Sequence, residues 1–251
     1  MISAHVVNAW LSNSISRSKE VKNCYGLLVL ATIFFVVSVN FMSCDNSTIS
    51  TIQGSGNIVI QERSVSGYDS ISFSAAGELN ITKGAAESLT ITTDDNLMEY
   101  IATSVENNVL KIGFREGVSL EPSDTITFDV VVIELNGIVF SGAGTVHADA
   151  LSVAGTFDLT VSGVADCTIA GQADTQNILI SGTCTYEASA LESTSAMVNL
   201  SGVGNLTLWV SGSLDVTITG VGDVYYYGSP TVTENITGIG KVEKLGATPP
   251  P

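Results

Sequence analysis

Polar and apolar residues alternate along most of the chain, and from Phe140 to Lys241 the alternation repeats around one short phrase, a Ser or Thr followed by Gly. The copies of this phrase end in Gly142, Gly163, Gly182, Gly202, Gly220 and Gly238, so they recur every 18 to 21 residues. A repeat of this length is typical of a solenoid, in which each coil buries its apolar face against its neighbours. The pattern therefore predicts stacked coils built from short strands.

The columns of the repeat predict which side chains are buried. Two residues before the glycine, and two and four residues after it, every copy carries an apolar, aromatic or very small residue. Side chains at even spacings share one face of a strand, so this face must point inward. No helical periodicity follows Leu110, and Pro is absent from Ser123 to Ser229. The predicted fold is all-β, a parallel β-helix of about six coils over residues 137–245, followed by a tail at 246–251.

Residues 54–136 are also rich in alternating segments but lack the repeat. They are predicted to form a β-rich layer that covers the first coil, because the open end of a solenoid exposes unpaired strand edges. One stretch, Asp94–Thr103, favours a short helix with Asp94 or Asp95 as its N-terminal cap. The layer and the coils form one domain or two closely packed ones.

The first 43 residues have the pattern of a signal peptide of the lipoprotein type. Basic residues precede an apolar run, Gly26–Val39, and the small residue Ser43 stands directly before Cys44. Cys44 is therefore predicted to carry a lipid that anchors the mature chain in the membrane, with residues 44–53 as a flexible tether. This predicts an outer-membrane lipoprotein of the cell envelope, facing the periplasm or the cell surface. The alternative is an uncleaved membrane anchor.

The net negative charge of the chain limits the classes of partner that it can bind. From Cys44 onward the chain has 6 basic and 24 acidic residues, a net charge of 6 − 24 = −18, and no Lys or Arg stands between Glu116 and Lys241. Binding to phosphates requires cationic side chains. The sequence therefore excludes nucleic acid as a partner and argues against other polyanions.

Residues that could carry catalysis or bind a metal are few. His147 is the only histidine after the predicted cleavage site, which gives no basis for a Ser–His–Asp triad or a histidine metal site. No cofactor is predicted, and we expect the chain not to be an enzyme. The alternative is a β-helical hydrolase of neutral polysaccharides that uses a carboxylate pair, either Asp158 with Asp166 or Asp215 with Asp223.

The register of the coils and the alternation along each strand also predict whether two cysteines and a run of three tyrosines are buried or exposed. Cys167 and Cys184 lie on adjacent coils but two residues out of register, so we expect them to be unpaired and buried. In the run Tyr225-Tyr226-Tyr227, alternation sends Tyr226 inward, so at most two of these rings are exposed. Capping of a late coil is favoured over a sugar-stacking platform for this run.

The outward columns of the repeat form the candidate binding face. One residue before each glycine stands Ser or Thr, and one residue after it stands a mainly aliphatic residue. The face is formed by Ser162, Val164, Ser201, Val203, Thr219, Val221, Thr237 and Ile239. An exposed apolar stripe on an acidic protein favours contact with a glycan, a protein ligand or a second copy of the chain. The alternative is that the hydroxyls bond one another along the stack while another part of the chain covers the stripe.

Several motifs in a fixed order resemble the head GIN domain family. They are Gln53–Ile58, Val65–Phe73, Asp94–Leu97 followed by Val109–Ile112, the serial Ser-Gly phrases, and Tyr227–Pro230, which together span residues 53–244. Members of this family are described as auto-transporter adhesins and are often bacterial lipoproteins. The resemblance implies a β-helical fold and an adhesin role, and it brings no catalytic residues. We therefore expect a non-catalytic adhesion or binding module of the cell envelope, with a purely structural envelope protein as a further alternative.

Overall fold

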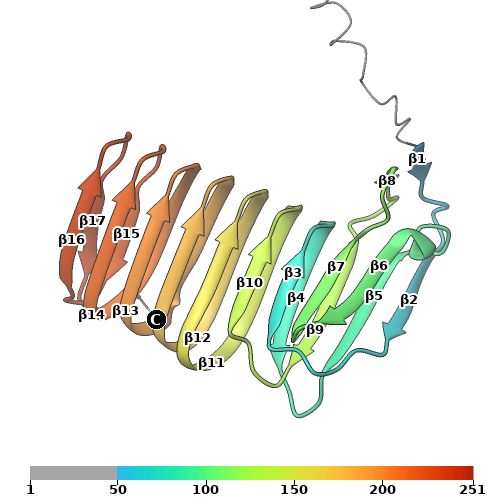
Figure 1. The fold of residues 1–251 in the computed structure, drawn as a ribbon, viewed down its shortest axis with the longest axis horizontal. Helices are drawn as coiled ribbons and strands as arrows, with labels where there is room; N and C mark the ends of the chain where they lie inside the picture. Colours follow the sequence, from blue (N-terminus) through green and yellow to red (C-terminus); the bar gives the residue numbers. More distant parts are fainter. Residues whose placement is uncertain (1–49, 251) are drawn as a thin grey trace, which may run out of the picture. The chain divides into compact units, whose positions relative to one another are not determined.

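The computed structural model describes residues 50–250. The predicted signal peptide, the predicted lipid site at Cys44 and most of the predicted tether lie outside these residues. Within them the chain forms seventeen strands and one three-residue 3-10 helix, and the predicted all-β solenoid is confirmed (Figure 1). No helix in this part of the chain is long and apolar enough to cross a membrane.

Four long strands each run round most of one coil. They are β11 (Ala143–Val161), β12 (Val164–Ile180), β13 (Thr183–Leu200) and β14 (Val203–Ile218), and each pairs in parallel with the next. Each strand bends near its middle, so every coil has two walls. The first wall runs from residues 143–148 to their partners at 203–210, and the second wall runs from 156–161 to 213–218.

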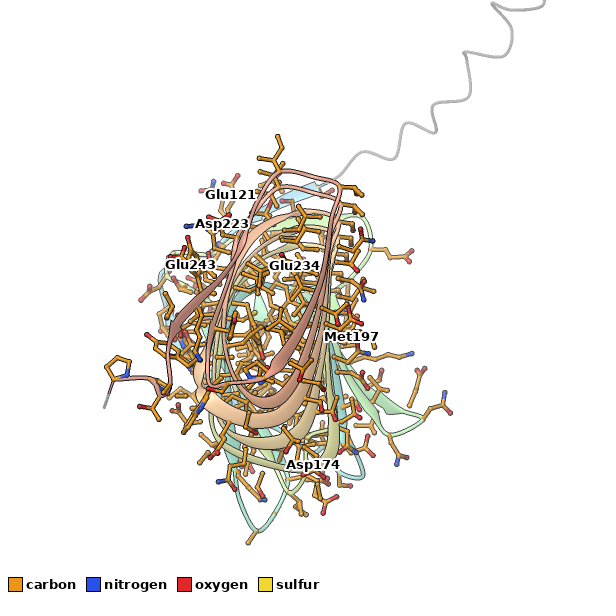
Figure 2. All side chains as sticks on the ribbon, turned by 90° about the vertical axis from the view of Figure 1, so that its left-hand side faces the viewer. Glu121, Asp174, Met197, Asp223, Glu234 and Glu243 are labelled. Carbon is orange, nitrogen blue, oxygen red and sulfur yellow. The ribbon has the colours of Figure 1, made fainter. Side chains whose placement is uncertain are left out.

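Shorter strands form the last coils. β15 (Val224–Tyr227) and β17 (Val242–Gly246) continue the first wall, and β16 (Thr231–Ile236) continues the second. Figure 2 looks along the stack onto this end, with Asp223 on the first wall, Met197 on the second and Asp174 at the bend. The two walls therefore present different side chains to solvent.

The end of the stack differs from its interior in the inward columns. Glu234 pairs with the buried Val216, and Lys244 pairs with Tyr226, which packs against the core. The Lys244 ammonium donates a hydrogen bond to Ser229 Oγ at 3.1 Å. At this end of the stack, β16 pairs only with β14 and β17 only with β15. The last coil thus places charge where a further coil would need an apolar core.

The parallel stack begins before the sequence repeat does. β3 (Ser70–Phe73) and β4 (Ala76–Lys83) pair in register with β10 (Gly137–Phe140) and β11, and on their other side with β7 (Val109–Phe114) and β9 (Thr127–Val132). Ser74-Ala75 takes the place of the Ser-Gly phrase at this corner, since the Ser141 N–H donates to the Phe73 carbonyl at 2.9 Å. The predicted layer therefore continues into the coils without a break.

Antiparallel strands cover the N-terminal end of the stack. β2 (Ile58–Arg63) pairs with β5 (Ser88–Asp94), β5 pairs with β9, and β6 (Ile101–Glu106) pairs with β7. β1 (Ser50–Gln53) and β8 (Val118–Glu121) form a separate two-stranded parallel sheet. The change from parallel to antiparallel pairing ends the coil geometry at this side.

The predicted short helix is a single turn, Met98–Tyr100, and the predicted cap is wrong. The turn has no side-chain cap. The Asp94 carboxylate instead accepts hydrogen bonds from the Gly56 N–H at 2.7 Å and from the Ser123 Oγ at 2.6 Å. The Asp95 carboxylate accepts hydrogen bonds from the side chains of Ser55 and Asn57, the two neighbours of Gly56 in the same loop. The bonds from Ser123 lower the pKa of Asp94. These carboxylates therefore tie loops together rather than starting a helix.

The core consists of the inward columns, as alternation predicts. The rings of Phe73 and Phe140, on successive coils, are fully buried and stack with centroids 5.0 Å apart. Cys167 and Cys184 are buried and unpaired, which confirms the prediction, and Cys184 pairs with Ala165, two residues from Cys167. Hydrogen bonding to the Cys184 thiol and burial raise the pKa of Cys167. Both residues act as small core side chains.

Candidate functional site

Each coil of the repeat turns at a Ser-Gly or Thr-Gly corner, and stacked corners share backbone hydrogen bonds. The Val203 N–H donates to the Gly182 carbonyl at 2.9 Å, and the Val221 N–H donates to the Gly202 carbonyl at 2.9 Å. A Cβ at Gly202 would lie 2.0 Å from the Gly182 oxygen, so the corners stack too closely for a side chain. Glycine in this column therefore sets the corner, and the residues on either side of it project outward.

All eight residues of the predicted binding face, hereafter the corner face, are exposed. Its four aliphatic members are 45 to 72 % exposed. Val164 pairs with Thr183, Thr183 with Val203, Val203 with Val221, and Val221 with Ile239, so they form one ladder in register. Within residues 50–250 the ladder is open to solvent, and the alternative that another segment of this part covers it is wrong.

The corner hydroxyls bond the main chain of the preceding coil. Ser201 Oγ donates to the Ile180 carbonyl at 3.2 Å, and Ser181 Oγ donates to the Val161 carbonyl at 3.5 Å. At these corners the hydroxyls do not bond one another, so the first part of the alternative, hydroxyl bonding along the stack, is also wrong. Because each hydroxyl donates inward, its lone pairs remain available on the outer surface.

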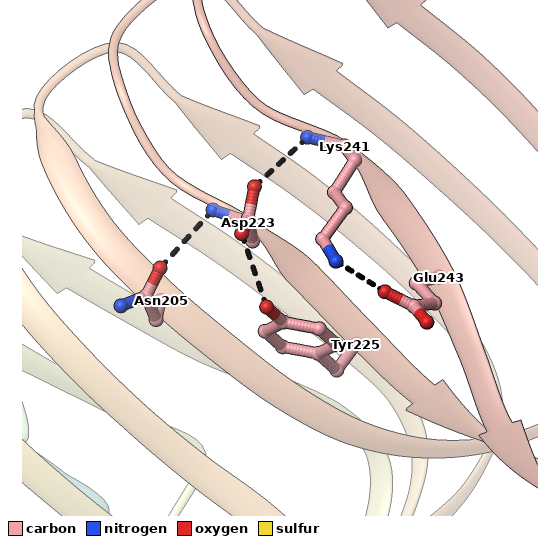
Figure 3. A network of polar contacts seen from close by, with 5 residues as sticks. All are labelled: Asn205, Asp223, Tyr225, Lys241 and Glu243. Atoms are coloured by element: carbon pink, nitrogen blue, oxygen red, sulfur yellow. Dashed lines mark hydrogen bonds and ion pairs between the residues drawn. The ribbon is translucent and has the colours of Figure 1, made fainter.

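A polar network closes the first wall near the end of the stack (Figure 3). The Asp223 N–H donates to Asn205 Oδ1 at 3.2 Å, the Lys241 N–H donates to Asp223 Oδ1 at 3.0 Å, and the Tyr225 hydroxyl donates to Asp223 Oδ2 at 3.0 Å. Lys241 pairs with Glu243 and lies 5.3 Å from the Tyr225 ring centroid. The bond to Asp223 raises the pKa of Tyr225, and Glu243 raises that of Lys241. The ammonium of Lys241 is thus already occupied.

The structure does not bring the carboxylate pairs of the hydrolase alternative together. Asp158 and Asp215 lie on the second wall, whereas Asp166 and Asp223 lie on the first. Because these side chains point outward from opposite walls, the core separates the members of each pair. His147 is exposed on the first wall, and the described part of the chain contains no group of three His, Cys, Asp or Glu residues that could hold a metal ion.

A polar groove lies where the coils bend, at the opposite turn from the corner face. This bend groove has a volume of about 380 Å³. Its polar lining includes Gln172, Asp174, Glu192, Ser193, Thr194 and Ser211. The sequence analysis missed it because β-bulges shift the register at the bends, so its residues share no fixed offset from the glycine.

A buried hydrogen-bond network lies directly behind the bend groove. The fully buried Tyr186 hydroxyl donates to Gln176 Oε1 at 2.9 Å, and Gln176 Nε2 donates to Ser193 Oγ at 3.0 Å. Ser193 Oγ donates in turn to the Trp209 carbonyl at 3.0 Å. Burial raises the pKa of Tyr186 well above its usual value, so the hydroxyl stays protonated and remains a donor. The floor of the groove is therefore fixed by satisfied bonds.

Trp209 and Tyr227 lie partly exposed on the first wall, next to Glu192 of the bend groove. Trp209 is flanked in sequence by two fully buried residues and therefore points to solvent, where it pairs with Glu192 on one side and Tyr227 on the other. Tyr226 packs against the core, as alternation predicts, which leaves Tyr225 and Tyr227 on the outer surface. The predicted inward position of Tyr226 is confirmed.

The architecture is shared with bacterial proteins of known structure. A Bacteroides fragilis protein described as a "putative adhesin" is 22% identical, and the similarity covers 77% of this chain and 100% of that one with a TM-score of 0.64. A Parabacteroides distasonis protein described in the same words is 22% identical over 78% of this chain and 100% of that one, with a TM-score of 0.50. At these identities the similarity shows a shared fold. No curated protein matches the chain.

A family match covers the body of the stack. The family described as "Putative auto-transporter adhesin, head GIN domain" matches residues 67–230, more than half of the chain. This segment begins just before β3 and includes all four long strands. The resemblance carried by the sequence motifs is thereby confirmed, and the chain belongs to the head GIN domain family.

Proposed function

We propose that the protein is a non-catalytic adhesion or binding module of the bacterial cell envelope, and that the corner face is its contact surface. The observation that supports this proposal is the exposed ladder in register from Val164 to Ile239, which is aliphatic except for Thr183. An aliphatic surface that lies open over several coils favours burial against a partner. Membership in a family of adhesins agrees with this role.

The chemistry of the corner face favours a protein surface over a sugar. Aliphatic side chains and hydroxyls alternate there without a charged residue, on a chain that carries a large excess of acidic groups. A partner with a flat apolar strip, including a second copy of this chain, would remove this surface from water without having to desolvate charge. The excess of negative charge elsewhere limits non-specific association.

The anchor belongs to the same proposal. We infer from Ser43-Cys44 that Cys44 carries the lipid of an outer-membrane lipoprotein facing the periplasm or the cell surface. Intact-mass analysis of membrane-extracted protein should give a chain that starts at Cys44 and carries added acyl mass, and Cys44→Ser should abolish this mass. A mature chain that starts elsewhere would contradict the anchor without affecting the corner face.

A pair of matched double variants tests the contact surface. Val203→Lys with Val221→Lys places two charges on the corner face, and Leu179→Lys with Met197→Lys places the same charges on exposed apolar positions of the second wall. Outward positions tolerate charge, so both variants should keep the melting temperature of the wild type. Cell adhesion or self-association should be lost only in the first variant. Equal behaviour of the two variants would refute the corner face as the contact surface.

A further inference from the structure

The bend groove continues into a partly exposed aromatic row, which consists of Trp209 and Tyr227. Gln172 pairs with Glu192, Glu192 with Trp209, and Trp209 with Tyr227, so four successive strands contribute one side chain each. Neighbouring strands lie about 4.8 Å apart, so these four side chains together extend over about 14 Å. The site is therefore elongated along the stack and suits a chain-like ligand better than a single small molecule.

The groove offers many hydrogen bonds and no positive charge. Asp174 and Glu192 provide acceptors, while Gln172, Thr194 and Ser211 provide both donors and acceptors. None of its lining residues is Lys or Arg. An anionic ligand would meet two carboxylates with no cation to offset them, whereas a ligand rich in neutral hydroxyls could satisfy both kinds of group.

The aromatic row provides the apolar part of the site. Trp209 and Tyr227 project from adjacent strands, and the Tyr227 ring lies over Gly246 of the next strand. Aromatic rings that are partly open to solvent, as these two are, offer flat apolar faces with polarisable π-systems, onto which the C–H faces of sugar rings can stack. Alternating hydroxyl edges and C–H faces are a property of neutral saccharides.

The site is also preorganised. Ser193 lies in the lining of the groove and is held by the buried network that reaches through Gln176 to Tyr186. The same Ser193 hydroxyl bonds the main chain of Trp209, so the groove floor and the base of the aromatic row are mechanically linked. A rigid surface loses little entropy when it binds a flexible chain.

We propose that the bend groove, together with Trp209 and Tyr227, binds a neutral oligosaccharide that lies along the stack. The hydroxyls of the sugar contact Gln172, Asp174 and Glu192, and its ring faces stack on the two aromatic side chains. This site is distinct from the corner face, which lies at the opposite turn of each coil. The two proposals can therefore fail independently.

Tryptophan fluorescence tests the proposal directly. The chain has two tryptophans, Trp10 and Trp209, so in a Trp10→Phe chain the signal reports on the site alone. Cellohexaose, mannohexaose and xylohexaose are the neutral probes, and hexagalacturonate is the charged probe. At least one neutral probe should change the emission in a saturable way, and hexagalacturonate should bind more weakly. If no neutral probe binds at millimolar concentration, or if the charged probe binds best, the proposal is overturned.

Variants assign the binding to these residues. With calorimetry as the readout, Trp209→Ala and Glu192→Gln should each weaken binding of the active probe by about tenfold, the effect of losing one contact of about 1.4 kcal/mol. Glu192 is exposed and Trp209 is half-buried, so the melting temperature should stay close to that of the wild type for Glu192→Gln and fall only modestly for Trp209→Ala. The Val203→Lys, Val221→Lys variant should bind the probe as the wild type does. Unchanged affinity in both Trp209→Ala and Glu192→Gln would refute the site.

Discussion

Replacing Gly202 by alanine should destabilise the stack, although the change adds only one methyl group. The added Cβ would lie 2.0 Å from the Gly182 oxygen and 2.6 Å from the Ser181 carbonyl carbon and oxygen. These atoms belong to the backbone of the preceding coil, so no side chain can rotate away to make room. The backbone of Gly202 does not have a positive φ, so the effect is one of space and not of conformational preference.

The loss of stability in Gly202→Ala can be estimated from the backbone corners that must separate to admit the methyl group. Overpacking of a close contact costs about 1 to 3 kcal/mol. Separating the two corners also weakens the hydrogen bonds from Gly202 N to Ile180 O (3.1 Å) and from Val203 N to Gly182 O (2.9 Å), each worth about 1 kcal/mol. The expected loss is about 2 to 5 kcal/mol, and at about 2 to 4 °C per kcal/mol the melting temperature should fall by roughly 4 to 20 °C.

Thermal unfolding monitored by circular dichroism measures this fall, and two controls isolate its cause. Val203→Ala changes the adjacent outward residue and should alter stability by less than about 0.5 kcal/mol. Gly117→Ala tests backbone conformation alone, since Gly117 has a φ of +77° and open space around it. Should Gly202→Ala melt together with Val203→Ala, the inward and outward columns have been assigned to the wrong faces.

Three further changes test the core and the end of the stack. Tyr186→Phe removes the donor to the buried Gln176 amide and should cost about 1 to 3 kcal/mol in urea unfolding. Burial raises the pKa of Tyr68 from 10.0 to about 12, so the unfolded state ionises first and stability should fall as pH rises through this range, a fall that Tyr68→Phe should reduce. Glu234→Val with Lys244→Leu makes the last coil apolar and should raise the mass measured by light scattering through end-to-end association; an unchanged mass would contradict this reasoning.

The sequence is informative wherever one physical constraint recurs in every coil. The corner glycine must be free of a side chain, as the contact between Gly202 and Gly182 shows. Once that column is fixed, alternation assigns every neighbouring residue to the inside or the outside. The exposure of Val203 and Val221, the burial of Cys184 and the inward turn of Tyr226 all follow from this single constraint.

The first corner of the stack and the bends between the walls could not be predicted in this way, because their residues do not follow the repeat. The corner at Ser74-Ala75 lacks the glycine, so the sequence gives no sign that parallel stacking begins at β3. At the bends, bulges such as the one between Ala188 and Glu192 change the spacing, so Glu192 meets Trp209 although the repeat does not align them. The bend groove therefore appears only when the register is known.

The two ends of the stack are terminated by different means, and this difference bears on function. At the N-terminal side, antiparallel strands such as β2 and β6 replace the parallel coil, so the geometry itself changes. At the other side the coil geometry continues to β16 and β17, and Glu234 and Lys244 replace apolar side chains in its inward columns. Inward-pointing charges oppose the addition of another coil because its core would have to bury them. Association through the walls and corners is then favoured over growth along the stack, and the corner face and the bend groove both lie on those lateral surfaces.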